Sequence, residues 1–317
     1  MNTLGTMRAA VRRLISGLLG EKGEMATHAF YHRLLRATRR FDPHEDGHVL
    51  AVLAAIASRS GTILDVGANI GRFTWFFKHH APPGCLIYAF EPNPNAMMLL
   101  RGNLHGARNV HCLQLALGDQ DGAALMEVPT DAMGNSMTAL GWVAATANGG
   151  AKPSAIGIDV RRLDSMVDEG LVRPVAPVLM KIDVEGGEHG VLNGATDLLA
   201  DYRPVVYFEC QRHHLERTGA KPEDVWERLS ALGYVILAPR DGLYRVCPTA
   251  VDAVPNYLAV PIPQRRQPIN RLSAGDLIAL LDRDAPGRTP RWPLPPLPKR
   301  EHDGPSLAEV PSRRPWS

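Results

Sequence analysis

Between positions 62 and 262, short runs of hydrophobic residues alternate with segments in which apolar positions recur every three or four residues. Continuous apolar runs are typical of strands that are covered on both faces of a sheet, because neither face meets water. We therefore expect strands at 62–66, 85–90, 110–115, 178–183, 205–210, 234–238 and 257–261, with an additional edge strand at 123–128.

The segments between these runs predict helices. Their apolar residues fall on one side of a helix, at 72–80, 95–106, 190–201 and 222–233. Strands that alternate with helices in this way indicate an α/β fold built on a parallel, doubly wound sheet. The sequence shows no internal repeat.

Residues 1–60 are expected to form a helical lead to this domain. Two segments have an apolar face, formed by Val11, Leu14, Ile15 and Leu18 in the first and by Phe30, Leu34 and Leu35 in the second. Such a face packs against the domain or contacts a membrane surface or a partner. A further apolar helix is expected to end at Gly61.

The α/β domain is expected to span residues 61–262, and a tail rich in proline and arginine follows at 263–317. Proline cannot donate a backbone hydrogen bond and fixes its own φ, so we expect this tail to be extended or disordered. One short helix interrupts it, with Ser273 as the N-cap and an apolar face formed by Leu277, Leu280 and Leu281.

Composition and charge narrow the class of protein. The chain has 317 residues, 45% of them hydrophobic, and a net charge of +2, which gives no electrostatic reason to expect a nucleic-acid partner. No apolar run approaches the length of a transmembrane helix. The four cysteines are far apart in the sequence, which favours free thiols in a reducing compartment, and we expect a cytoplasmic protein. The oligomeric state is not predicted.

A glycine-spaced turn, Gly67-Ala68-Asn69-Ile70-Gly71, follows the first predicted strand, and Glu91 follows the second. In an open parallel sheet, ligands bind beyond the carboxyl ends of the strands, where an acid after the second strand can accept hydrogen bonds from ribose hydroxyls. Asn69 stands where a dinucleotide fingerprint has its second glycine. The turn therefore favours a nucleoside ligand without a pyrophosphate.

S-adenosylmethionine is such a ligand, because it carries a ribose, an adenine and a methionine arm in place of phosphates. Asp65, at the end of the first strand, is expected to face the methionine amino group.

Five segments, in order, resemble the successive blocks of the FkbM-type S-adenosylmethionine-dependent methyltransferases: LDVGANIGRFTWFF, AFEPNP, LALGDQDG, LMKIDVEGGEHGVLNGA and RPVVYFEC. The resemblance covers Thr62 to Pro261, and KIDVEGGE is its most specific part. It implies a seven-stranded, Rossmann-like class I methyltransferase sheet that closes in a hairpin-like pair of strands. It also implies methylation of a hydroxyl on a sugar, a glycan or a natural-product scaffold.

The resemblance further implies which residues contact the cofactor. The turn contributes Asp65, Gly67, Ala68, Asn69 and Gly71, and Glu91 follows. The loop from Leu117 to Asp119 is implied as the adenine edge.

Asp183, Glu185 and Glu188 lie within six residues after the fourth strand. Asp183, at the strand tip, should face the cofactor and the transfer site. Three roles fit the cluster: a carboxylate acts as general base, or Asp183 and Glu185 bind a divalent metal together with Glu209, or the glutamates favour the next helix N-terminus. A metal fits this cluster, but we do not expect one.

His213 and His214 follow the fifth strand, and histidine is the usual proton acceptor near neutral pH. We take His213 as a catalytic candidate beside Asp183 and Glu185, with a solvated loop as the alternative.

Three functions fit these motifs: a methyltransferase, which we favour, an NAD(P)-dependent oxidoreductase, or a non-catalytic nucleoside-binding module. The acceptor cannot be read from the sequence. The long, glycine-rich segment at 130–157 is expected to be a loop over the substrate.

Overall fold

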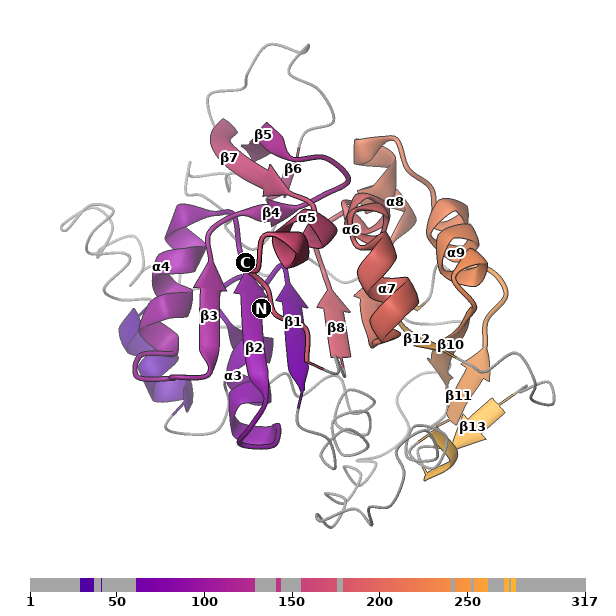
Figure 1. The fold of residues 1–317 in the computed structure, drawn as a ribbon, viewed down its shortest axis with the longest axis horizontal. Coiled ribbons are helices and arrows are strands. Elements are labelled where there is room, and N and C mark those ends of the chain that lie inside the picture. The colour runs from indigo at the N-terminus through magenta and orange to yellow at the C-terminus, as the bar shows by residue number, and fades with distance from the viewer. Residues whose placement is uncertain are drawn as a thin grey trace, which may run out of the picture.

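A computed structural model describes most of the predicted α/β domain and parts of both ends. The described residues are 29–36, 41, 61–128, 141–143, 155–175, 179–240, 243–251, 254–261, 271–273 and 275–277. Figure 1 shows a central twisted sheet with helices packed against it, and a smaller sheet beyond the carboxyl ends of the central strands. The expected helices around 11–18 and before Gly61 lie outside the described residues, as do Leu280 and Leu281.

All seven predicted strands are present, and all belong to one sheet. In the order of the chain they are β1 (Thr62–Val66), β2 (Leu86–Phe90), β3 (Val110–Leu113), β8 (Leu179–Ile182), β9 (Val205–Glu209), β10 (Tyr234–Arg240) and β12 (Asn256–Pro261). Across the sheet they follow the order β3-β2-β1-β8-β9-β12-β10. The first five pair in parallel, and β12 runs antiparallel to both β9 and β10. This confirms the predicted Rossmann-like class I sheet and its hairpin-like close.

The sheet is wider than predicted. Strands β11 (Leu243–Val246) and β13 (Arg271–Ser273) extend the β10 edge, so the sheet has nine strands. Strand β13 lies in the segment that was expected to be extended or disordered, outside the predicted domain. After it, Ser273 and Asp276 form a reciprocal capping box: the Ser273 hydroxyl accepts from the Asp276 amide at 3.1 Å, as predicted for an N-cap, and the Asp276 carboxylate accepts from the Ser273 amide at 2.9 Å. Leu277 then packs into the core.

Alternate side chains of the strands pack on opposite faces of the sheet. Leu64 and Val66 of β1 belong to one buried cluster with residues of the helices α5 (Leu163–Asp168), α6 (Glu188–Gly194), α7 (Thr196–Tyr202) and α9 (Pro222–Ala231). Ile63 meets α3 (Arg72–His80) on the other face, where α4 (Pro94–Asn103) covers β2. The doubly wound arrangement is therefore as predicted, with helices on both faces.

One predicted helix, 190–201, is divided in two at Ala195. A Cβ on Gly194 would lie 1.9 Å from the carbonyl oxygen of Gly118, so the chain passes close to another backbone at this point. Asp164 then accepts hydrogen bonds from the amides of Asp197 and Leu198, at 3.2 and 3.1 Å, and so caps α7 from a neighbouring helix.

The predicted edge strand at 123–128 does not join the central sheet. It forms β5 (Gly122–Glu127) of a second, four-stranded sheet with the order β4-β7-β5-β6, whose other members are β4 (Ala116–Leu117), β6 (Trp142–Val143) and β7 (Ala155–Arg161). The segment predicted as a loop, 130–157, therefore contributes β6 and the start of β7 to this sheet. Its remaining residues, 130–140 and 144–154, lie outside the described residues.

The helix at 29–36 exposes part of the face that was expected to pack. Phe30 and Leu34 are 68% and 53% exposed, whereas His32 is buried and its ring lies 5.6 Å from that of Phe41.

Three of the four free cysteines, Cys85, Cys210 and Cys247, are buried, in agreement with the expected thiols. Among the described helices, none has the length and apolar character that crossing a bilayer requires.

Candidate functional site

A pocket opens at the carboxyl ends of β1, β2 and β8, where ligands bind in open parallel sheets. The second sheet lies on its far side and contributes Leu117, Met126 and, beside β6, Gly141. Among the described residues, its lining consists of Val66, Gly67, Asn69, Phe90, Glu91, Pro92, Leu115, Ala116, Leu117, Met126, Gly141, Asp183, Val184, Glu185 and Gly187. Six of the predicted site residues are among them: Gly67, Asn69, Glu91, Leu117, Asp183 and Glu185.

The turn after β1 has three residues in left-handed backbone conformations, with φ of 75° at Gly67, 51° at Asn69 and 87° at Gly71. A Cβ on Gly67 would lie 1.8 Å from the carbonyl oxygen of Asp183. Gly67 is therefore required by the close approach of the chain after β8, in addition to any ligand. Asn69 tolerates its conformation better than most residues, which gives this position a backbone reason for its identity.

Glu91 ties this turn to the end of β2. Its carboxylate accepts hydrogen bonds from the amides of Asn69 and Asn93, both at 2.8 Å, and the side chain is almost fully buried. Burial raises the pKa of Glu91 to about 7, against the opposing effect of these two amides. Each carboxylate oxygen retains a free lone pair, so Glu91 can accept two further hydrogen bonds from a ligand in the pocket.

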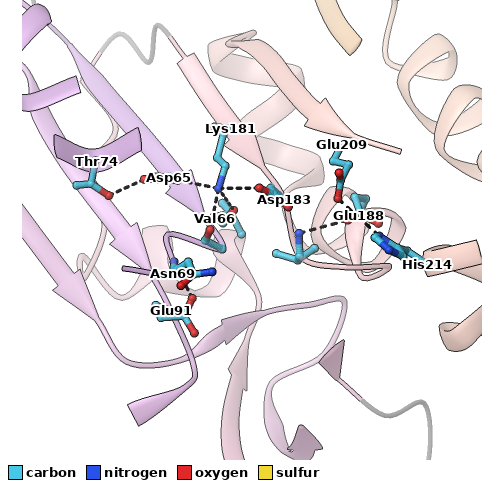
Figure 2. A network of polar contacts seen from close by, with 12 residues as sticks. Asp65, Val66, Asn69, Thr74, Glu91, Lys181, Asp183, Glu188, Glu209 and His214 are labelled. Carbon is cyan, nitrogen blue, oxygen red and sulfur yellow. Dashed lines mark hydrogen bonds and ion pairs between the residues drawn. The ribbon is translucent and has the colours of Figure 1, made fainter. Parts of the chain in front are cut away.

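A buried lysine that was not among the predicted site residues joins the polar network behind the turn after β1 (Figure 2). Lys181 of β8 is 2% exposed, and its ammonium group donates to the carbonyl oxygen of Gly67 at 2.7 Å. It also pairs with Asp65 at 3.2 Å and with Asp183 at 3.6 Å. The signal was readable, because a lysine in the middle of an apolar strand needs buried partners.

Asp65 lies behind the turn. Its carboxylate is fully buried and accepts a hydrogen bond from the Thr74 hydroxyl at 2.5 Å, while it faces Lys181 on the other side. The side chain thus points into the protein instead of into the pocket, so a direct contact with a methionine amino group stays a prediction that this position does not favour. Ala68 and Gly71 are buried, Asp119 is exposed, and none of the three lines the pocket.

The three acids after β8 lie in different surroundings. Asp183 keeps 39% of its side chain open toward the pocket, yet the surrounding protein and the charges of Glu209 and Asp65 raise its pKa, which Lys181 opposes. Glu185 has a left-handed φ of 56°, and burial, followed by the charges of Glu209 and Asp183, raises its pKa to about 8. Glu188 is 2% exposed and accepts from the amides of Val184 and Gly186, both at 3.2 Å. As the first residue of α6, Glu188 fits the helix-terminus role predicted for it.

His214, rather than the predicted His213, faces the acids. Helix α8 (Arg212–Leu215) points successive side chains about 100° apart, so only one of two adjacent histidines can turn inward. His213 is exposed, whereas Nδ1 of His214 lies 3.1 Å from Glu185 and 3.6 Å from Glu209. Burial would raise the pKa of Glu209, but the nearby His214 and the hydrogen bond from Gln211 lower it.

Replacing Glu188 by glutamine is expected to flatten the pH dependence of stability. Burial raises the pKa of Glu188 from 4.5 to about 7. Its protonated form therefore stabilises the fold below about pH 4.5, and this contribution is lost as the pH rises through 7. Between pH 5 and 8, the free energy of unfolding of the wild type should fall by on the order of 1–3 kcal/mol more than that of Glu188→Gln.

Urea unfolding at several pH values in the presence of a chelator measures this difference. The exposed Glu216→Gln is the matched control and should follow the wild type. Parallel curves for the wild type and Glu188→Gln would show that Glu188 has an ordinary pKa.

Residues 65–236, more than half of the chain, match the sequence profile of the Methyltransferase FkbM domain. The 31-O-demethyl-FK506 methyltransferase FkbM of Streptomyces tacrolimicus is 30% identical over 210 residues, which cover 57% of this chain and 75% of that protein. The hexuronic acid methyltransferase AglP of Haloferax volcanii is 30% identical over 186 residues, 57% of this chain and 66% of that protein. Methyltransferase 1 of Beauveria bassiana is 31% identical over 148 residues, 43% of this chain; the chain spans only 58% of that relative's length.

Solved structures of methyltransferases are similar at a greater distance. A methyltransferase FkbM from Methylobacillus flagellatus KT has a TM-score of 0.39 and 19% identity, over 63% of this chain and 43% of that chain. An O-methyltransferase from Bacillus cereus in complex with SAH has a TM-score of 0.39 and 14% identity, over 80% and 97%.

Proposed function

Because the chain belongs to the FkbM methyltransferase family, we propose that it transfers a methyl group from S-adenosylmethionine to a hydroxyl of a sugar, a glycan or a natural-product scaffold. The names of two relatives support this class of acceptor, since one is named for O-methylation of the FK506 scaffold and the other for a hexuronic acid. Small hydroxylated molecules are therefore the proposed partners, without nucleic acid. The cytoplasm stays the predicted location.

The position of Glu91 is the observation that carries the proposal. Glu91 directly follows β2 and lines the pocket, and its carboxylate accepts hydrogen bonds from the amides of Asn69 and Asn93. A carboxylate fixed in this way can accept hydrogen bonds from both hydroxyls of a ribose. The turn after β1 has Asn69 where a dinucleotide-binding turn has the second glycine that admits a pyrophosphate. This arrangement favours a nucleoside cofactor over NAD(P), and so favours a methyltransferase over the alternative oxidoreductase.

The rest of the pocket suits the two ends of S-adenosylmethionine. Leu115, Leu117 and Met126 form an apolar wall on the side of the second sheet, where an adenine ring would pack. The turn at Gly67 and Asn69 lies on the opposite side, toward Asp183, where the methionine arm would lie. The sulfonium would then be near the acids that follow β8.

The chemistry requires alignment and a proton acceptor. S-adenosylmethionine would supply the methyl group, whose bond to sulfur would break as its bond to the acceptor oxygen forms, and the hydroxyl proton would have to be accepted by the protein or by water. Holding the donor and acceptor in line supplies much of the rate, because the cofactor is already activated. Asp183 faces the pocket and has a raised pKa, so it is the proposed proton acceptor.

Calorimetry with S-adenosylhomocysteine and with NAD⁺ tests the proposed cofactor. We expect S-adenosylhomocysteine to bind one per chain, and NAD⁺ to bind at least about 100-fold more weakly, since the turn leaves no cradle for its pyrophosphate. Transfer of a labelled methyl group to a panel of sugars and macrolides would then separate an enzyme from a non-catalytic module. Tighter binding of NAD⁺ would overturn the proposal.

A further inference from the structure

The loops that follow β8 and β9 are pinned together beside the pocket. Gly186 has a φ of 115°, and a Cβ there would lie 2.2 Å from the carbonyl oxygen of His214. The Thr218 hydroxyl donates to the carbonyl oxygen of Gly186 at 2.8 Å. This contact between backbones brings Glu185, on the first loop, against Glu209 and His214, at the end of β9 and after it.

The three side chains converge on one point. One ligand atom from each of Glu185, Glu209 and His214 lies within 4.8 Å of the other two. Nδ1 of His214 and Oε2 of Glu185 are 3.1 Å apart, yet neither atom has a hydrogen-bond partner of acceptable geometry, and both are buried. Only 9% of the surface of His214 is exposed. A cation between them would satisfy both the buried nitrogen and the buried carboxylate oxygen that faces it.

We propose that Glu185, Glu209 and His214 bind a divalent first-row transition-metal ion. Two carboxylates and one imidazole suit Mn²⁺ or Zn²⁺ better than Mg²⁺ or Ca²⁺, which take oxygen ligands. Ligand atoms that lie about 2.1 Å from one ion and next to each other around it are about 3 Å apart, as Nδ1 and Oε2 are here. The site differs from the sequence-based set, because His214 takes the place of Asp183.

The surroundings complete a metal site. Gln211 donates to the other oxygen of Glu209 at 2.6 Å, which turns the free oxygen of Glu209 toward His214. Lys181, a residue of β8, is already paired with Asp65 and Asp183. The wall of the pocket includes Glu185, so an open coordination position of the ion would face the acceptor. Lowering the pKa of an acceptor hydroxyl there is a role that rests on the proposed function; metal binding itself does not.

Calorimetric titration of the full chain with MnCl₂ and, separately, with ZnCl₂, after dialysis against a chelator, tests the site. The wild type should bind one ion per chain. Glu209→Gln, which keeps the shape of the side chain, should bind at least about tenfold more weakly. The matched control Glu216→Gln changes an exposed glutamate outside the cluster and should bind like the wild type. Glu185→Gln is the second variant if Glu209→Gln does not fold.

Binding of S-adenosylhomocysteine, measured on the same samples, separates this inference from the proposed function. If neither ion binds to the wild type, or if both variants bind like the wild type, the metal site is refuted, whatever the cofactor result. If the metal binds and S-adenosylhomocysteine does not, the metal site stands and the proposed function fails.

Discussion

Replacing Glu91 by alanine is expected to weaken the binding of S-adenosylhomocysteine by at least about 100-fold. Hydrogen bonds to a charged group contribute about 1.5–3 kcal/mol each, and the carboxylate is positioned to accept two from a ribose. The substitution also releases the amides of Asn69 and Asn93, which Glu91 now holds at 2.8 Å. The turn that faces the ligand would lose its anchor at the same time, so the two losses should reinforce each other.

Calorimetry on three variants separates these contributions. Glu91→Gln keeps one carbonyl oxygen and should bind with an affinity between those of the wild type and Glu91→Ala. Glu223→Ala, an exposed glutamate on α9, should leave the affinity unchanged. Thermal unfolding must accompany each titration, because loss of the turn would also lower the melting temperature. An affinity of Glu91→Ala within twofold of the wild type would refute the ribose assignment.

Replacing Lys181 by methionine is expected to destabilise the fold by about 3–5 kcal/mol, the usual cost of leaving a buried charge without its partner. Lys181 is 2% exposed and Asp65 is fully buried, so the carboxylate of Asp65 cannot recover its loss by contact with water. The carbonyl oxygen of Gly67 would lose its hydrogen bond as well. Asp183, which is 39% exposed, would be affected less.

Urea unfolding of a double-mutant cycle tests this. Lys181→Met combined with Asp65→Asn removes both charges and should recover a substantial part of the lost stability, because the remaining amide is neutral. Lys221→Met is the matched control: this lysine is exposed, and its replacement should change the free energy of unfolding by less than about 0.5 kcal/mol. A loss below about 1 kcal/mol for Lys181→Met would mean that water reaches the pair.

Most of the central sheet could be predicted because its strands are local patterns. The run of β2, LIYAF, is apolar throughout, and this property is readable without knowing the neighbouring strands. The second sheet could not be predicted in the same way. Strands β4 and β6 have two residues each, and their pairing with β7 and β5 joins segments far apart in the chain. No local signal sets such a pairing.

The residues of the site also differ in whether a local sequence pattern could predict their positions. Glu91 and the turn at Gly67 could be located because they follow strands whose ends must meet. The inward turn of His214 could not, since it depends on the direction in which α8 begins. The sequence also explained the glycine at position 67 only in part, by the approach of a ligand. The glycine is needed as well because a side chain there would collide with the carbonyl oxygen of Asp183, more than 100 positions along the chain.

The division of the pocket between two sheets has a consequence for engineering. The floor, with Glu91 and the turn at Gly67, adjoins the central sheet, where Lys181 of β8 holds the turn, whereas Leu117, Met126 and Gly141 belong to the second sheet or adjoin it. Libraries that recombine residues 116–161 among relatives would exchange the roof of the pocket and leave the hydrogen bonds of the floor intact. Because Leu117 and Met126 form the wall proposed for the adenine ring, such libraries would vary the adenine contact of the donor while the ribose contact proposed for Glu91 stays unchanged.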